Sequence, residues 1–208
     1  NTSADKGLSP DALLLKRTKL FDTYQIHLEG SWTPETLQVM EEACFLFFGL
    51  VPGDPQFWQW VERLSVRLEQ IKSGGLTSRN LVRLNPAALT RWTVVHELAH
   101  AWDASQGWKI SAWMAKETGS GFSHPLLHHL LPSKRDYWYT VGSPPPPCGV
   151  DAFFNRREDF AESVSATLFP DEAKTRADQR GWGYALYGYS HFHETPRGQL
   201  IQRLLHSK

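Results

Sequence analysis

Apolar and polar residues alternate or recur at helical spacing along much of this 208-residue chain, and these patterns predict its elements. Strict alternation over 24–29 predicts a half-buried strand. Start signals of the Thr-Pro and Asp-Pro type, followed by apolar residues at helical spacing, predict helices over 34–49 and over 55–73, the second ended by a glycine pair. The first residues, 1–20, show little periodicity and are expected to form a loose arm or a short helix.

The second half of the pattern adds a strand and two helices. Leu81–Leu84 is predicted to be a short strand. Asn155 caps a predicted helix that Pro170 ends, and Thr195 opens a closing helix. The chain is therefore predicted to be an α+β protein, mostly helical with a small sheet.

The densest apolar run surrounds two histidines and one glutamate, in the order His96, Glu97, His100. Because a helix advances about 100° per residue, the two imidazoles lie one above the other and Glu97 lies beside them. Two histidines at this spacing can share a metal ion, and the glutamate is then close enough to accept a proton from water. The flanking apolar residues indicate that this helix is buried with one polar stripe.

A catalytic zinc site normally has three protein ligands, so a third must come from elsewhere in the chain. The metzincin extension would need glycine at position 103 and histidine at 106, where this chain has Asp103 and Gln106. Glu158 and Glu162 share one face of the later helix, so that one carboxylate could bind the metal and the other brace a ligand imidazole. Glu158 could instead form a capping box with Asn155.

The segments 96–100, His-Glu-Leu-Ala-His, and 158–162, Glu-Asp-Phe-Ala-Glu, resemble the gluzincin zinc metallopeptidases, in particular the group of the anthrax lethal factor catalytic domain. The resemblance covers about thirty residues of the chain. It implies a zincin-like fold with one Zn²⁺. In such a fold Leu81–Leu84 is expected to be the edge strand of the sheet, beside the active-site helix, where an extended peptide could pair its backbone. The resemblance also implies that His96, His100 and Glu158 are the ligands, that Glu97 is the general base, and that Glu162 and Asp103 support the ligands from behind.

Members of that family often carry a tyrosine about seven residues before the ligand glutamate, where its hydroxyl stabilises the oxyanion. That position is Asp151 in this chain, after an unusual run of four prolines. Tyr139 is our candidate for the displaced role, because a loop folded over the site could bring it to the metal. His191 and His193 are rival candidates for the same task.

Charge and length bound the remaining possibilities. The chain carries 22 basic and 22 acidic residues, so its formal net charge is zero. It therefore lacks the positive net charge that would indicate binding to nucleic acid or to an anionic membrane. No apolar run reaches the roughly 18 residues that a membrane span requires. We expect one domain over 1–208, monomeric, with scaffold elements over 20–75 and a catalytic core over 76–208.

The two cysteines do not indicate whether the protein works inside or outside the cell. Cys44 falls on the apolar face of a predicted helix, which favours a buried thiol, although a disulfide with Cys148 is an alternative. Because the sequence begins at Asn1, we expect a processed or excised chain, secreted or extracellular. A cytoplasmic or delivered protein is the alternative.

The function predicted from these features is that of a zinc metalloendopeptidase whose substrate is a protein or peptide. One alternative has the same chemistry but a narrower role, that of a toxin or effector protease that cleaves a single host protein. A second alternative is a catalytically inactive binding or scaffold module that zinc stabilises.

Overall fold

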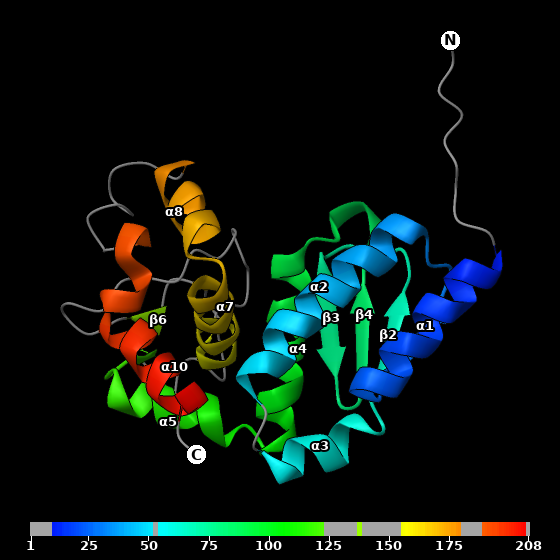
Figure 1. Cartoon of the computed structure of the whole chain (residues 1–208). Coiled ribbons are helices and arrows are strands. Elements are labelled where there is room, and N and C mark those ends of the chain that lie inside the picture. Colours follow the sequence, from blue (N-terminus) through cyan, green and yellow to red (C-terminus); the bar gives the residue numbers. More distant parts are fainter. Residues whose placement is uncertain (1–9, 52–53, 123–136, 139–154, 180–188, 207–208) are drawn as a thin grey trace. The chain divides into compact units, whose positions relative to one another are not determined.

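The structure is a computed structural model that describes residues 10–51, 54–122, 137–138, 155–179 and 189–206 (Figure 1). Its architecture is mixed α+β and mostly helical, as predicted. The chain divides into two compact units, residues 1–97 and 98–208, with the boundary inside helix α4 (Arg91–Ser105). None of the helices described is both long enough and apolar enough to cross a membrane.

The first unit contains a four-stranded sheet with the strand order β1-β2-β4-β3. The strands β1 (His27–Gly30), β2 (Ser65–Leu68) and β4 (Leu81–Leu84) run parallel to one another. Strand β3 (Gly75–Ser78) pairs with β4 in the antiparallel direction and is the last strand of the described sheet. The prediction that Leu81–Leu84 forms the edge is therefore wrong, because a tight connection from β3 places β4 between two partners.

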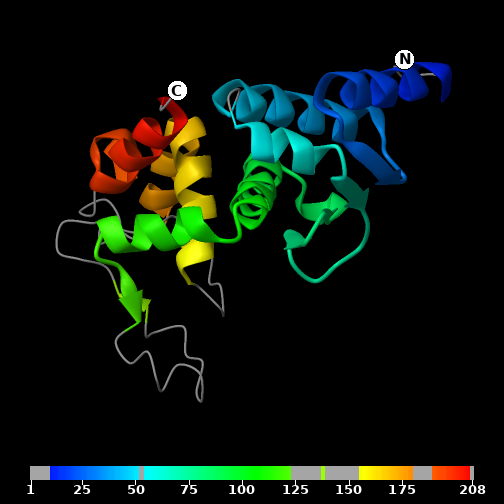
Figure 2. The same ribbon diagram turned by 90° about the horizontal axis from the view of Figure 1, so that it is seen from below.

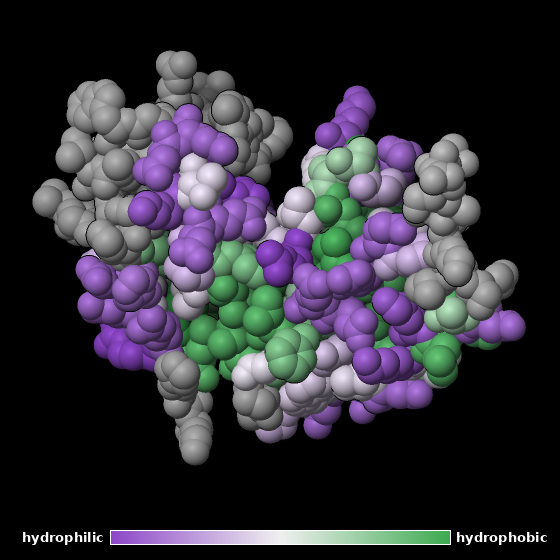
Figure 3. All heavy atoms as spheres, turned by 45° about the horizontal axis from the view of Figure 1, so that its top comes forward, coloured by the Kyte–Doolittle hydropathy of each residue, from purple (hydrophilic) through white to green (hydrophobic). Residues whose placement is uncertain are grey.

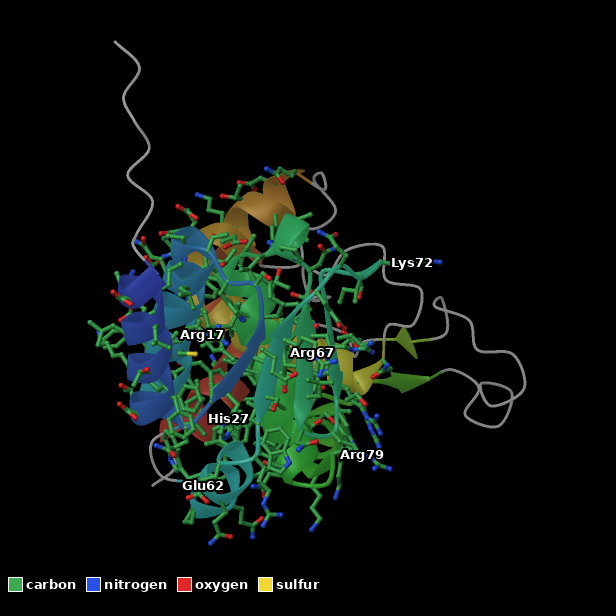
Figure 4. All side chains as sticks on the ribbon, turned by 90° about the vertical axis from the view of Figure 1, so that its right-hand side faces the viewer. Arg17, His27, Glu62, Arg67, Lys72 and Arg79 are labelled. Atoms are coloured by element: carbon green, nitrogen blue, oxygen red, sulfur yellow. The ribbon has the colours of Figure 1, made fainter. Side chains whose placement is uncertain are left out.

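The two faces of this sheet differ in polarity, as the alternation of side chains along a strand requires. Val66 and Val82 lie opposite each other on the buried face. Glu29, Arg67 and Arg83 lie opposite one another on the other face. There the Arg67 guanidinium donates to a Glu29 carboxylate oxygen, with Nη2 at 2.6 Å from Oε2, and this contact lowers the pKa of Glu29. Figure 4 shows Arg67 on this strand.

The first unit also contains the helices α1 (Pro10–Tyr24), α2 (Pro34–Leu50) and α3 (Pro55–Val61), the short η1 (Pro86–Ala88) and the N-terminal part of α4. Helix α2 begins as predicted, because the Thr33 hydroxyl accepts a hydrogen bond from the Thr36 N–H. Helices α1 and α2 lie side by side on one side of the sheet in Figures 1 and 2.

The surface over α1 and α2 is largely hydrophilic in Figure 3, with hydrophobic residues among the polar ones. Leu14 and Leu15 of α1 and Phe45 of α2 are exposed, whereas Leu20 and Phe47 are buried. Of the two expectations for the first residues, a loose arm or a short helix, the described part forms a helix, α1. Leu20 of this helix is part of the core.

The predicted helix over 55–73 is wrong beyond its second turn. Helix α3 ends at Val61, and β2 follows after a short turn. Leu64 and Leu68 are four residues apart, which suggested a helix, but Val66 between them is also buried. The pattern is thus an alternating one with period two, and pairing with both β1 and β4 satisfies the backbone.

The second unit begins with the C-terminal part of α4 and is mostly helical. The predicted helices after Asn155 and Thr195 are confirmed. Its other described elements are α5 (Lys109–Glu117), β5 (Gly121–Phe122), β6 (Tyr137–Trp138), α7 (Arg156–Leu168), α8 (Pro170–Gln179), the short η3 (Tyr189–Glu194) and α10 (Pro196–His206).

Candidate metal centre

Helix α4 carries two of the three residues of the candidate centre. It starts after Thr90, whose hydroxyl accepts a hydrogen bond from the Thr93 N–H and so satisfies a free donor of the first turn. Most of its residues are buried, as the dense apolar run predicts. His96 and His100 are one turn apart on this continuous helix, so the helix itself fixes their separation.

His96, His100 and Glu158 form the only group of potential metal ligands found among the described residues. One ligand atom from each side chain lies within 4.8 Å of those of the other two. His100 Nε2 is 3.3 Å from Glu158 Oε2, and His100 is buried. Two atoms bound to one zinc at tetrahedral geometry lie about 3.3–3.5 Å apart, so this pair has the spacing of ligands.

Helix α7 brings Glu158 to His100 within the second unit. The Asn155 side chain accepts a hydrogen bond from the Arg157 N–H, which fixes the first turn of the helix. The buried rings of Trp102 on α4 and Phe160 on α7 pack at a centroid distance of 5.7 Å. Because α7 is held on α4 by this packing, the Glu158 carboxylate reaches the histidines from the neighbouring helix.

A buried ion pair fixes the other side of the same turn of α7. Asp159 and Arg197 of α10 are both completely buried. Arg197 Nε donates to Asp159 Oδ1 at 2.7 Å, and Arg197 Nη2 donates to Oδ2 at 3.0 Å. Nη2 also donates to the Ser120 hydroxyl at 2.5 Å. The residue after the candidate ligand therefore anchors α7 to α10.

Glu97 is buried on α4, with 5% of its surface exposed, and it contacts strand β3 of the first unit. The Thr77 hydroxyl lies 2.6 Å from Glu97 Oε2 and 3.1 Å from the Glu97 backbone carbonyl oxygen. A Cβ atom at Gly75 would lie 2.5 Å from Glu97 Oε1, so the carboxylate occupies space that only glycine leaves open. The edge strand of the sheet thus lies beside the helix that carries Glu97.

Asp103 and Glu162 were predicted to support the ligands. Both are buried. Asp103 Oδ1 accepts hydrogen bonds from the N–H groups of Ile110 and Ser111 at 3.0 and 3.1 Å, so it caps α5 in place of Trp108, whose side chain makes no cap. That Asp103 and Glu162 also support a ligand imidazole stays a prediction.

Most of the remaining predicted side chains are not described by the structure. Tyr139 and Cys148 lie outside the described residues, and so does the side chain of His191. His193 is exposed, with Nε2 3.5 Å from Glu194 Oε1. Cys44 is a buried free thiol, and burial raises its pKa.

The sequence interpretation missed two contacts of this region. Thr77 was not noticed because the preceding glycine pair was interpreted as the end of a helix, although Gly75 and Thr77 share one face of a short strand. Arg197 was not noticed because only the apolar residues of its predicted helix were expected to be buried, whereas the Arg197 side chain is buried as well. A comparison with known proteins finds no matching family model, curated protein or solved structure.

Proposed function

We propose that this protein is a zinc-dependent endopeptidase of the gluzincin kind. The observation that carries the proposal is the convergence of His96, His100 and Glu158, whose ligand atoms lie within 4.8 Å of one another. A buried carboxylate, Glu97, follows His96 directly on the same helix. Metal ligands alone could be structural, but a carboxylate held next to them adds a group that can move a proton.

The donor set of this group suits zinc. Two imidazole nitrogens and one carboxylate oxygen are ligands that zinc accepts, and three of them leave one position of a tetrahedron for water or substrate. When bound, zinc supplies Lewis-acid chemistry, in which it acidifies water and polarises the carbonyl of a peptide bond.

Glu97 has the role of general base in this proposal. Its carboxylate accepts a proton from the attacking water and then passes that proton to the nitrogen of the leaving amine, so that the carboxylate is regenerated after each turnover. Burial limits the number of competing waters around it, and the contact with Thr77 restricts its rotamer.

Strand β3 is the site proposed for the substrate backbone. Only one of its sides is paired in the described sheet, and its residue Thr77 contacts the proposed base. An extended peptide that pairs with the other side of β3 gains backbone hydrogen bonds whatever its sequence. Proteins and peptides are therefore the substrate class that fits this arrangement.

The first test is metal content. We expect the purified protein to bind one zinc per chain, and His96→Ala, His100→Ala and Glu158→Ala each to lower zinc occupancy strongly. His27→Ala is the matched control, because His27 is an exposed histidine of β1, labelled in Figure 4. Full zinc occupancy in all three ligand variants would contradict the proposed centre.

The second test separates catalysis from a structural role of the metal. Glu97→Gln should retain zinc and lower kcat for a peptide substrate by about 100-fold or more, the usual scale for a lost general base. Glu62→Gln is the control, since Glu62 is exposed on the first unit (Figure 4). If the parent protein binds cobalt with four protein ligands and no exchangeable water, the inactive scaffold alternative replaces this proposal.

A further inference from the structure

We infer that Gly75 and Thr77 of strand β3 form a holder that orients the Glu97 carboxylate for proton transfer, with Thr77 as a positioning residue. The inference rests on the proposed function, because it assigns a task to the base named there. It goes further in placing part of the catalytic machinery on the sheet edge, before the metal-binding helix in sequence.

The geometry of the strand supports this pairing of residues. Gly75 and Thr77 are two apart, so they occupy the same face of β3. Their partners on β4 are Leu84 and Val82, which are both buried, so this is the inward face of the sheet. Leu76 points to the opposite face and is exposed. The strand thus turns only these two residues toward the buried Glu97.

The two residues act on different oxygens of the same carboxylate. Thr77 Oγ1 lies 2.6 Å from Oε2, which is the length of a charge-assisted hydrogen bond between a hydroxyl and an ionised oxygen. Oε1 lies over Gly75, where any larger residue would meet it. With Oε2 held by Thr77, the oxygen over Gly75 is the one assigned to the proton transfer.

Gly75 contributes by leaving space for the Glu97 carboxylate, since it has no side chain of its own. A Cβ atom there would lie 2.5 Å from Glu97 Cγ and Oε1 and 2.7 Å from Cδ. These atoms belong to the end of a flexible side chain, so an alanine can be accommodated by moving the carboxylate while the backbone stays in place. Gly75→Ala is therefore a way to displace the base without removing it.

The experiment compares variants of the full chain with the parent protein on one peptide substrate, with zinc content and thermal unfolding measured for each. Thr77→Val, which keeps the shape but loses the hydroxyl, and Gly75→Ala should each lower kcat about tenfold or more, because a small misplacement of a reacting group is costly. KM should stay within about twofold and zinc occupancy should be unchanged. Thr77→Ser keeps the hydroxyl and should restore most of the activity.

Gly74→Ala is the matched control for the glycine, since its Cβ would lie 3.5 Å from the nearest atom, an ordinary contact. Thr23→Val is the control for the loss of a threonine hydroxyl, because Thr23 is exposed on α1. If Glu97→Gln abolishes hydrolysis while Thr77→Val and Gly75→Ala keep the parental kcat, the holder is wrong and the proposed function stands. If Glu97→Gln itself keeps full activity, the proposed function fails first.

Discussion

Replacing Arg197 with methionine is expected to destabilise the protein by about 3–5 kcal/mol, the usual cost of removing one partner of a buried ion pair. Arg197 and Asp159 are both fully buried, and two N–H groups of the guanidinium donate to the two carboxylate oxygens at 2.7 and 3.0 Å. Methionine fills much of the space but donates nothing. The Asp159 charge would then remain in the interior without its cation, and that residual charge accounts for most of the cost.

The measurement is urea unfolding followed by far-UV circular dichroism, at the same zinc concentration for every variant. Arg176→Met is the matched control, because Arg176 pairs with Glu172 at 2.8 Å on α8, where both side chains are partly exposed. A helical surface pair of this type contributes about 0.3–0.5 kcal/mol. The reasoning about burial is refuted if Arg197→Met costs less than about 1 kcal/mol.

A double variant separates charge from packing. Asp159→Asn combined with Arg197→Met leaves no uncompensated charge, so it should be more stable than Arg197→Met alone. If adding Asp159→Asn recovers nothing, the cost of the single variant comes from lost packing around α10 and the electrostatic explanation is wrong.

Three further predictions concern stability and reactivity elsewhere in the chain. Gly30→Ala should destabilise by about 2 kcal/mol or more in urea unfolding, because Gly30 has a φ of +89° and a Cβ would collide with the Leu68 carbonyl oxygen. Asp103→Ala should cost about 1–2 kcal/mol by the same assay, since α5 loses its cap; full stability would show that the cap contributes nothing. In a Cys148→Ser background, Cys44 should react with a thiol reagent at pH 8 only after unfolding, because burial raises its thiol pKa. Rapid reaction of the native protein would contradict this.

Helix starts were the most predictable part of the fold. The start of α2 at Thr33, that of α7 at Asn155 and that of α10 at Thr195 follow from local chemistry, since a capping side chain bonds to an N–H two or three residues away. Such bonds form within one turn of the helix. They are therefore visible in a short stretch of sequence.

The sheet was harder to predict because its pattern depends on partners far along the chain. Strand β2 has only four residues, and its buried Leu68 has helical spacing to the buried Leu64 until β1 and β4 are placed on its two sides. The edge position of β4 was expected from the resemblance to zincins. Strand β3, which lies beyond β4 in the described sheet, is in a segment that was interpreted as a helix end. Four-residue strands carry too few alternations to distinguish the two periods.

The candidate centre combines both kinds of information. His96, Glu97 and His100 lie on one helix, so their mutual arrangement follows from the helical repeat alone. The approach of Glu158 depends on packing of α7 against α4, although the need for a third ligand pointed to it. Thr77 could not be found in this way, because its role depends on where β3 lies and no rule of spacing connects residue 77 with residue 97.

Glu158 and Asp159 show how one turn of α7 serves two neighbours. Consecutive residues of a helix point about 100° apart, so the first can face α4 while the second faces α10. Glu158 is a partly exposed carboxylate 3.3 Å from His100, whereas Asp159 is fully buried against Arg197. The ion pair therefore fixes the rotation of α7 about its axis. Because that rotation sets where the Glu158 carboxylate lies, Arg197 contributes to the geometry of the candidate centre without touching it.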